Sequence, residues 1–251
     1  MECKLVKIRE NREISSGIFS LTFEGSFTSD PGQFFMVKLL NSEAFLPRPI
    51  SVHDVDKGTL TMVYAVVGKG TSIMTSLKAG DQVQLTGPLG VGFDPSAING
   101  RIALVSGGIG IAPFKLLVKT LAGKSMDLFC GFRHDVYLTD ELEPMVDHLY
   151  ISTEDGSTGH KGFITDILRP EEYDIVITCG PEPMMHKVVS MCRAKGVPSF
   201  VSTEARMACG VGACLVCTCK TVNGNKRTCK DGPVFRGEER MINAYRRGVR
   251  S

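Results

Sequence analysis

Residues 101–113 read Arg-Ile-Ala-Leu-Val-Ser-Gly-Gly-Ile-Gly-Ile-Ala-Pro, and this stretch decides the fold of the middle of the chain. Its first six residues form an apolar run, as in a strand that is buried on both faces. From Ala112 to Leu121 the apolar residues recur at helical spacing. Glycines at a strand-to-helix turn let a phosphate approach the free N–H groups of the helix, so we expect Gly107, Gly108 and Gly110 to bind one. The pattern is GGxGxAP rather than GxGxxG, so a tight turn without a ligand is the alternative.

Strand and helix patterns continue to alternate after this stretch. We expect strands at Met126–Phe132, His148–Ser152, Asp174–Cys179 and Ser199–Ser202, and a helix at Glu182–Lys195. Such alternation predicts a parallel α/β domain, which we place at residues 99–203. Ligands of such sheets bind at the carboxyl ends of strands, so Cys179, Gly180 and Pro181 could share one crevice with the glycine turn. For Cys179 alone, an inert buried thiol is the alternative.

Residues 1–98 are rich in β structure instead. Strand-forming runs occur at Ile18–Phe23, Thr59–Val67 and Val83–Thr86, and Gly- and Pro-containing turns separate them. This spacing predicts a small antiparallel β-barrel, although a sandwich would give the same pattern.

Two short motifs in this half have the chemistry of a phosphate site. Arg48 offers a planar fork of donors to a pyrophosphate, Pro49 stiffens the chain, and Ser51 adds a hydroxyl group. Gly68-Lys69-Gly70-Thr71 resembles a turn that faces phosphate. A surface salt-bridge arginine and an ordinary turn are the alternatives.

Nine cysteines occur in a chain that shows no export signal, and five of them lie between Cys209 and Cys229. The spacing Cys209-x4-Cys214-x2-Cys217-x11-Cys229 matches the plant-type [2Fe–2S] pattern in its first three members. Structural zinc sites usually pair two CxxC knuckles, and only one is present here, so zinc is the weaker alternative. Cys219 could replace a ligand, because residues 217 and 219 of a strand share a face. We therefore expect a small metal-dependent module over residues 204–235.

The composition excludes several classes of protein. The formal net charge of +2 is too small for a dedicated nucleic-acid binder. No apolar run approaches the roughly 18 residues of a membrane span, and no signal-peptide core is present, so we expect a cytoplasmic protein. Residues 236–251 hold five Arg and two Glu, and this basic tail is either a solvated end or a docking segment.

The motifs occur in a fixed order along residues 3–235: RPIS (48–51), GKGT (68–71), GPLGVGF (87–93), GGIGIAP (107–113), CGP (179–181), MACGVGAC (207–214) and CKDGPVF (229–235). This order resembles the ferredoxin reductase superfamily and, more narrowly, the electron-transfer subunits of bacterial type-B, NAD-dependent dihydroorotate dehydrogenases. Ile50 stands where many ferredoxin reductases carry Tyr, which favours the narrower family.

The resemblance implies an FAD-binding barrel, an NAD-binding α/β domain and a C-terminal [2Fe–2S] module. The implied FAD residues are Arg48, Pro49, Ile50, Ser51, Val63, Tyr64, Ala65, Gly70 and Thr71. The implied NAD residues are Gly107, Gly108, Gly110, Cys179, Gly180 and Pro181. The implied cluster ligands are Cys209, Cys214, Cys217 and Cys229.

The resemblance also implies a partner. In the family, electrons pass from the cluster to FMN in a separate catalytic subunit, in a heterotetramer with two copies of each subunit, during pyrimidine biosynthesis. NADH gives up two electrons as hydride, the cluster takes one at a time, and a flavin can do both, so we expect no catalytic acid or base.

Three alternatives stay open. One is an NAD(P)H-oxidising subunit of a ferredoxin, sulfide or hydrogenase complex, with the same motifs. The others are a redox sensor without turnover and a zinc-stabilised interaction module. The preference for NADH or NADPH is also open, because Arg133 could approach a 2′-phosphate or lie free on the surface.

Overall fold

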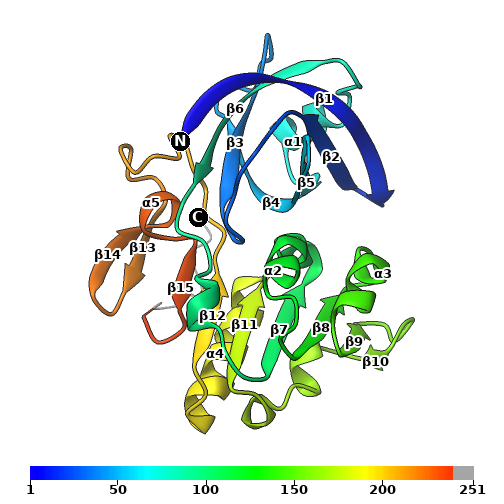
Figure 1. Ribbon diagram of the computed structural model, residues 1–251, viewed down its shortest axis with the longest axis vertical. Helices are drawn as coiled ribbons and strands as arrows, with labels where there is room; N and C mark the ends of the chain where they lie inside the picture. The colour runs from blue at the N-terminus through cyan, green and yellow to red at the C-terminus, as the bar shows by residue number, and fades with distance from the viewer. Residues whose placement is uncertain (240–251) are drawn as a thin grey trace, which may run out of the picture.

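Six strands close into an antiparallel barrel at the N-terminal end of the computed structural model, which describes residues 1–239 (Figure 1). The order around the barrel is β1-β2-β5-β4-β3-β6. The bounds are β1 Glu2–Ser15, β2 Ile18–Glu24, β3 Phe34–Leu39, β4 Arg48–Asp56, β5 Thr59–Ala65 and β6 Gln82–Leu89, with helix α1 at Lys69–Met74 between β5 and β6. Alternate residues of β5, Leu60, Met62 and Tyr64, are buried in the barrel core, as the period of a strand requires. The predicted barrel is confirmed.

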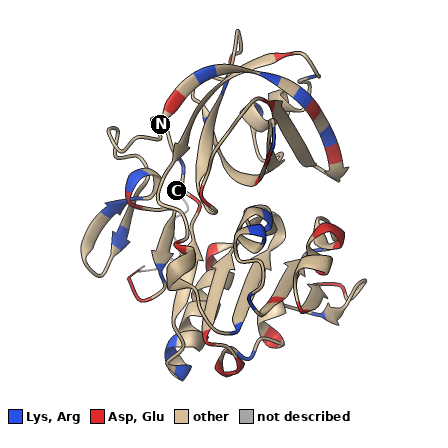
Figure 2. Ribbon diagram, in the orientation of Figure 1, with Lys and Arg blue, Asp and Glu red and all other residues tan. Residues whose placement is uncertain are grey.

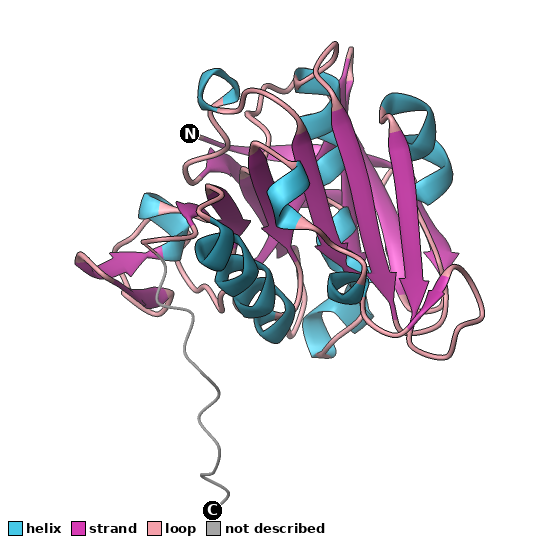
Figure 3. Ribbon diagram, turned by 90° about the horizontal axis from the view of Figure 1, so that it is seen from below, coloured by secondary structure: helices cyan, strands magenta, loops and turns pink. Residues whose placement is uncertain are grey.

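The second region is a large sheet with helices beside it (Figure 3). It has seven strands in the order β10-β9-β8-β7-β11-β12-β15. The first six strands of this order pair in parallel, and only β15 is antiparallel. The strands are β7 Ile102–Gly107, β8 Met126–Phe132, β9 His148–Thr153, β10 His160–Lys161, β11 Ile175–Cys179, β12 Ser199–Ser202 and β15 Val234–Arg236. The helices are α2 Phe114–Thr120, α3 Thr139–Leu142 and α4 Glu182–Lys195, with 3-10 turns at Pro95–Ala97, Gly108–Ile111, Glu143–Met145, Ile164–Asp166 and Pro170–Glu172.

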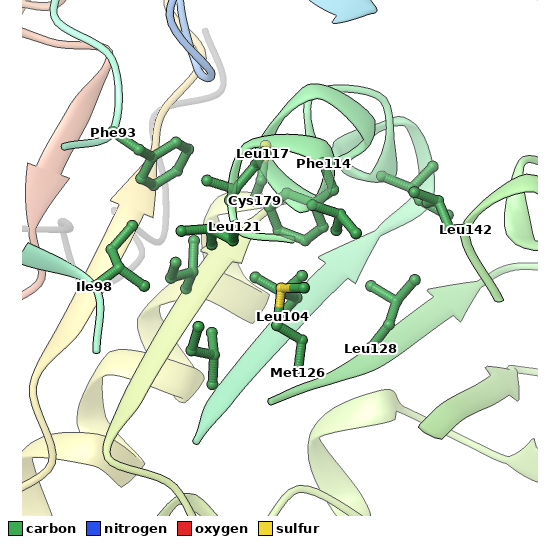
Figure 4. Close-up of a cluster of buried hydrophobic side chains, with 14 of the residues drawn as sticks. Phe93, Ile98, Leu104, Phe114, Leu117, Leu121, Met126, Leu128, Leu142 and Cys179 are labelled. Atoms are coloured by element: carbon green, nitrogen blue, oxygen red, sulfur yellow. The ribbon is translucent and has the colours of Figure 1, made fainter. Parts of the chain in front are cut away.

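Strand β7 is buried throughout because both faces of the sheet are covered. Ile102 and Leu104 pack in the cluster that contains Phe114 and Leu117 of α2, which Figure 4 shows. Ala103 and Val105 pack on the other face, in the cluster that contains Val188 and Cys192 of α4. The predicted parallel α/β fold is confirmed. The longest helix among the described residues, α4, has 14 residues. No helix in this part of the chain is long and apolar enough to cross a bilayer.

The cysteines lie in a third, smaller region with a two-stranded sheet, β13 Thr218–Thr221 with β14 Gly224–Arg227, followed by helix α5 Thr228–Asp231. Basic residues gather on β14 and α5 (Figure 2). Backbone contacts join this region to both others: the Val91 N–H donates to Gly232 O at 2.6 Å, and β15 pairs with β12. The region is therefore fastened to the barrel and to the large sheet, while residues 240–251 of the basic tail lie outside the described residues.

A polar network joins the barrel to the α/β domain beside α2. His53 of β4 is 2% exposed, and its Nδ1 lies 2.7 Å from Ala112 O, which can only accept, while its Nε2 lies 2.9 Å from Glu141 Oε1. Lys115 pairs with the same carboxylate. Burial opposes ionisation of Glu141, but the hydrogen bonds and charges of His53 and Lys115 outweigh it and lower its pKa to about 2. The two domains are thus held together by paired charges as well as by packing.

Candidate functional site

A cavity of about 470 Å³ lies against the barrel and is called the barrel cavity here. Its barrel wall contains eight of the nine residues that the sequence motifs assign to FAD: Arg48, Pro49, Ile50, Ser51, Val63, Tyr64, Ala65 and Thr71. Strands β4 and β5, which pair in the barrel, present seven of these residues, and helix α1 presents Thr71. Two motifs that are separated in the sequence therefore meet in one cavity.

Gly70 is the ninth of these residues, and it contributes by leaving space for the side chain of Arg48. A Cβ atom at this position would lie 1.9 Å from Arg48 Nε, so the absence of a side chain gives the guanidinium its place. Arg48 also donates to the carbonyl oxygens of Ala44 and Leu46. The stretch that we expected to be a turn begins helix α1, and Thr71 Oγ1 accepts from the Val67 N–H at 2.9 Å. Gly70 therefore leaves room for the Arg48 side chain, and Thr71 accepts a hydrogen bond at the start of helix α1.

The second cavity, of about 350 Å³, lies at the carboxyl ends of β7 and β11 and is called the nucleotide cavity here. Gly107, Gly108, Gly180 and Pro181 line it, so the two predicted turns do meet. Gly110 instead lies against the backbone, where a Cβ atom would come within 2.2 Å of the Cys179 carbonyl oxygen. This glycine allows the two turns to approach each other.

Cys179 lines the barrel cavity rather than the nucleotide cavity. Its side chain is 4% exposed and packs in the cluster under α2 (Figure 4). Burial and then the negative charge of Glu204 raise the pKa of this thiol to about 12. Cys179 is therefore an uncharged thiol in the cavity wall and has no nucleophilic thiolate form at neutral pH.

Three residues line both cavities: Ile109, Thr203 and Glu204. Thr203 Oγ1 donates to Pro233 O at 3.1 Å, which fixes its position. Glu204 makes no hydrogen bond and no ion pair with any of residues 1–239, and the protein around it raises the pKa of its carboxyl group although solvent reaches it through the cavities. The sequence motifs miss Thr203 and Glu204. The available signal was their position directly after strand β12, at a carboxyl end of the sheet.

The four cysteines of the motif form two pairs. In the outer pair, the N–H groups of Val211 and Cys214 point at Cys209 Sγ, at 3.5 and 3.4 Å. In the inner pair, which is buried, Cys217 Sγ and Cys229 Sγ are 3.2 Å apart. Burial opposes ionisation of Cys209, but these N–H groups outweigh it and lower its pKa to about 6, while burial and the nearby Cys217 thiol raise the pKa of Cys229 to about 12.

The donor set fits a two-iron cluster. Four thiols in two pairs match the four thiolates that such a cluster takes, two on each iron. The backbone N–H groups that already point at Cys209 are the kind of donor that stabilises cluster sulfur. Within residues 1–239, no three His, Cys, Asp or Glu side chains converge on one point as ligands of a single metal ion.

Cys219 lies apart from these two pairs. Cys217 precedes the first residue of β13, so residues 217 and 219 do not share the face of one strand as expected. Cys217 and Cys229 pack with Phe34, Met36 and Leu89 of the barrel. Cys219 packs in a different cluster, with Met185 and Val189 of α4 and with Phe235. Cys219 is thus a packing residue between the cysteine region and the α/β domain.

Comparisons with known proteins agree with this geometry. The family profile of the iron-sulfur cluster binding domain of dihydroorotate dehydrogenase B matches residues 204–240, and that of the oxidoreductase NAD-binding domain matches residues 104–190.

Curated relatives match almost the whole chain. The electron transfer subunit of dihydroorotate dehydrogenase B (NAD(+)) from Clostridium acetobutylicum is 50% identical over 94% of this chain and 96% of its own length. The subunit of the same name from Clostridium perfringens is 53% identical, over 93% and 96%.

One solved structure, of an NADH-dependent reduced ferredoxin-NADP oxidoreductase, superposes with a TM-score of 0.83 at 33% identity and covers 94% of this chain and 89% of its own. The family resemblance that the sequence motifs predict is confirmed: this chain belongs to the family of electron transfer subunits of dihydroorotate dehydrogenase B.

Proposed function

We propose that this chain is the electron-transfer subunit of an NAD-dependent dihydroorotate dehydrogenase, passing electrons between NAD(H) and the FMN of a separate catalytic subunit in pyrimidine biosynthesis. The observation that carries the proposal is the wall that the two cavities share at Ile109, Thr203 and Glu204. Five residues after Glu204 the same segment reaches Cys209. Two cavities and a four-thiol site in immediate succession are what a three-cofactor relay needs.

The cofactors implied are FAD in the barrel cavity, NAD(H) in the nucleotide cavity and a [2Fe–2S] cluster on the four paired cysteines. When bound, FAD accepts a hydride from NADH and gives electrons singly to the cluster. Arg48 supplies a fork of donors for the FAD pyrophosphate. The turns at Gly107 and Gly180 leave room for the dinucleotide pyrophosphate beside free N–H groups. Cys209, Cys214, Cys217 and Cys229 would hold the cluster.

The partner subunit is inferred from what dihydroorotate oxidation requires. Dihydroorotate oxidation needs a second flavin site, and the two cavities described above are taken by FAD and NAD(H) in this proposal. We therefore expect a heterotetramer with two copies of each subunit, located in the cytoplasm, in which the cysteine region contacts the FMN subunit. The purified chain alone should not oxidise dihydroorotate.

An absorption spectrum tests the relay. We expect protein produced with ample iron and riboflavin to show flavin and iron–sulfur absorbance, and both should bleach when NADH is added without oxygen. A preparation that lacks either cofactor, or whose spectrum NADH leaves unchanged, contradicts the proposal. Conversion of dihydroorotate to orotate by the chain alone, followed at the orotate absorbance, contradicts the assigned division of labour.

The likeness to the NADH-dependent reduced ferredoxin-NADP oxidoreductase favours a second candidate, a subunit of a ferredoxin-linked complex. The 50% and 53% identities to dihydroorotate dehydrogenase subunits, against 33% for the ferredoxin-linked protein, favour the first candidate. Affinity purification from the source cell separates them: the first predicts a partner that contains FMN and oxidises dihydroorotate, and the second predicts a partner that reacts with ferredoxin.

A further inference from the structure

Glu204 is an unpaired carboxylate at the point where the two cavities meet. It lines both the nucleotide cavity and the barrel cavity, together with Ile109 and Thr203. The cationic side chains that line the barrel cavity are Arg48 and Arg206, and neither forms an ion pair with Glu204. Its charge also reaches the thiol of Cys179 across the barrel cavity. Because Glu204 is exposed to solvent in the cavities and has no partner among residues 1–239, its carboxylate is available to a ligand that enters either cavity.

The proposed function determines which part of the ligand arrives there. The glycine turns, Gly107-Gly108 and Gly180, line the nucleotide cavity only, whereas Glu204 also lines the barrel cavity. A dinucleotide whose pyrophosphate lies on the turns has its nicotinamide end directed to the shared wall, because that end must meet the flavin. The oxidised nicotinamide ring carries a positive charge, and the reduced ring is neutral. A carboxylate at this position therefore distinguishes the two by charge.

We propose that Glu204 is a specificity-determining residue that binds the cationic nicotinamide ring and makes the site prefer NAD⁺ over NADH. This inference rests on the proposed function and adds to it, since a site that stabilises the oxidised ring makes bound NADH a stronger hydride donor. Glu204 has no part as an acid or base in this role. Its contribution is a fixed negative charge at the junction of the cavities.

The test measures two dissociation constants on the FAD-loaded protein by titration of the flavin absorbance. The ligands are NAD⁺ and 1,4,5,6-tetrahydro-NAD, whose nicotinamide ring is neutral and cannot transfer hydride. For Glu204→Gln, which keeps the shape and removes the charge, we expect NAD⁺ to bind about 10-fold more weakly. The affinity for tetrahydro-NAD should change less than about 3-fold. An unchanged ratio of the two constants overturns the inference.

Three further variants make the result specific. Glu204→Asp keeps the charge and should keep the preference for NAD⁺, which also covers the case in which the Gln variant loses its flavin. Glu182→Gln removes a carboxylate that lines the nucleotide cavity only, so it should shift both affinities together. Glu143→Gln changes an exposed carboxylate that lines neither cavity and should shift neither.

The outcomes also separate this inference from the proposed function. Wild-type protein that binds neither nicotinamide ligand, and is not bleached by NADH, contradicts the proposed function. Wild-type protein that binds both, with a Gln variant of unchanged preference or an Asp variant that loses it, contradicts the role of the Glu204 charge alone.

Discussion

The cavities and the cysteine region of this molecule are stabilised in different ways. Strands β4, β5, β7 and β11 supply part of the cavity walls and belong to regular sheets with buried cores, as in β7, where all six residues are buried. Between Ser202 and Val234, by contrast, the only regular elements are β13, β14 and α5, with four residues each. Val211, Leu215 and Val216 of this region are 40%, 60% and 57% exposed. Packing of regular sheets supports the strand part of the cavity walls. The cysteine region has little core of its own, and we expect it to need a ligand to order it.

This difference predicts that a single substitution can remove the cluster without removing FAD. Cys229→Ser should abolish the cluster and leave FAD in place, because Cys229 belongs to the buried inner pair while the barrel cavity is built from other residues. The expected loss of iron is essentially complete, since a two-iron cluster needs four thiolates. Iron analysis and the visible spectrum of the purified variant measure both cofactors.

The matched control is Cys219→Ser, which changes the neighbouring cysteine outside the two pairs. It should retain iron and lose only some packing against Met185 and Phe235. Loss of flavin together with iron in Cys229→Ser would show that the cavities depend on the cluster, against the comparison above. Loss of iron in Cys219→Ser would show that this thiol is a ligand.

The α/β sheet and the cysteine region can be predicted from the sequence to different extents, because packing restricts the sequence of the first and ligand chemistry restricts that of the second. The strands of the α/β sheet are visible as apolar runs because both faces of the sheet are covered, as Ile102 and Ala103 show on opposite faces. The four cysteines proposed as cluster ligands can be recognised in the sequence because cluster chemistry restricts the spacing of its ligands. The sequence pattern does not predict strand β15, because tertiary contacts determine its pairing with β12.

Within the site, residue type is predictable and residue environment is not. The motif predicts that Gly110 faces a ligand, but the structure places this glycine against the Cys179 carbonyl, and sequence cannot distinguish the two environments. Glu204 lies in no motif, because its importance comes from two cavities that exist only once the domains have packed. Predictions from patterns are therefore strongest where local chemistry restricts the chain.

The cavity side of the comparison is tested most directly at Gly70. A methyl group there would meet the Arg48 guanidinium, so Gly70→Ala should displace Arg48 and weaken FAD binding by about 10-fold, the equivalent of roughly one charge-assisted hydrogen bond. Gly68→Ala is the matched control two residues away, where a Cβ atom meets nothing within 4 Å and the backbone is extended. Titration of the flavin-free protein with FAD gives both affinities. Equal affinities for the two variants would mean that Arg48 is not a phosphate donor.

The cavities also depend on the contact between the barrel and the α/β domain, which supply their walls. A substitution in this contact should have the smallest effect of those considered, a change in the free energy of unfolding. Glu141 has a pKa of about 2 in the folded protein, against an ordinary value of 4.5, so its ionised form contributes stability above about pH 4.5 that is lost as the pH falls toward 2. Glu141→Gln should lower the free energy of unfolding by about 1–2 kcal/mol at pH 7, because solvent reaches part of the pair. Urea unfolding at pH 7, 5 and 3 should show equal differences from wild type at the first two values and a smaller one at pH 3. A difference that stays constant down to pH 3 would mean that shape, rather than the charges of His53 and Lys115, explains the loss. The cluster content of this variant should be unchanged, since the network lies between the barrel and the α/β domain and does not include the cysteine region.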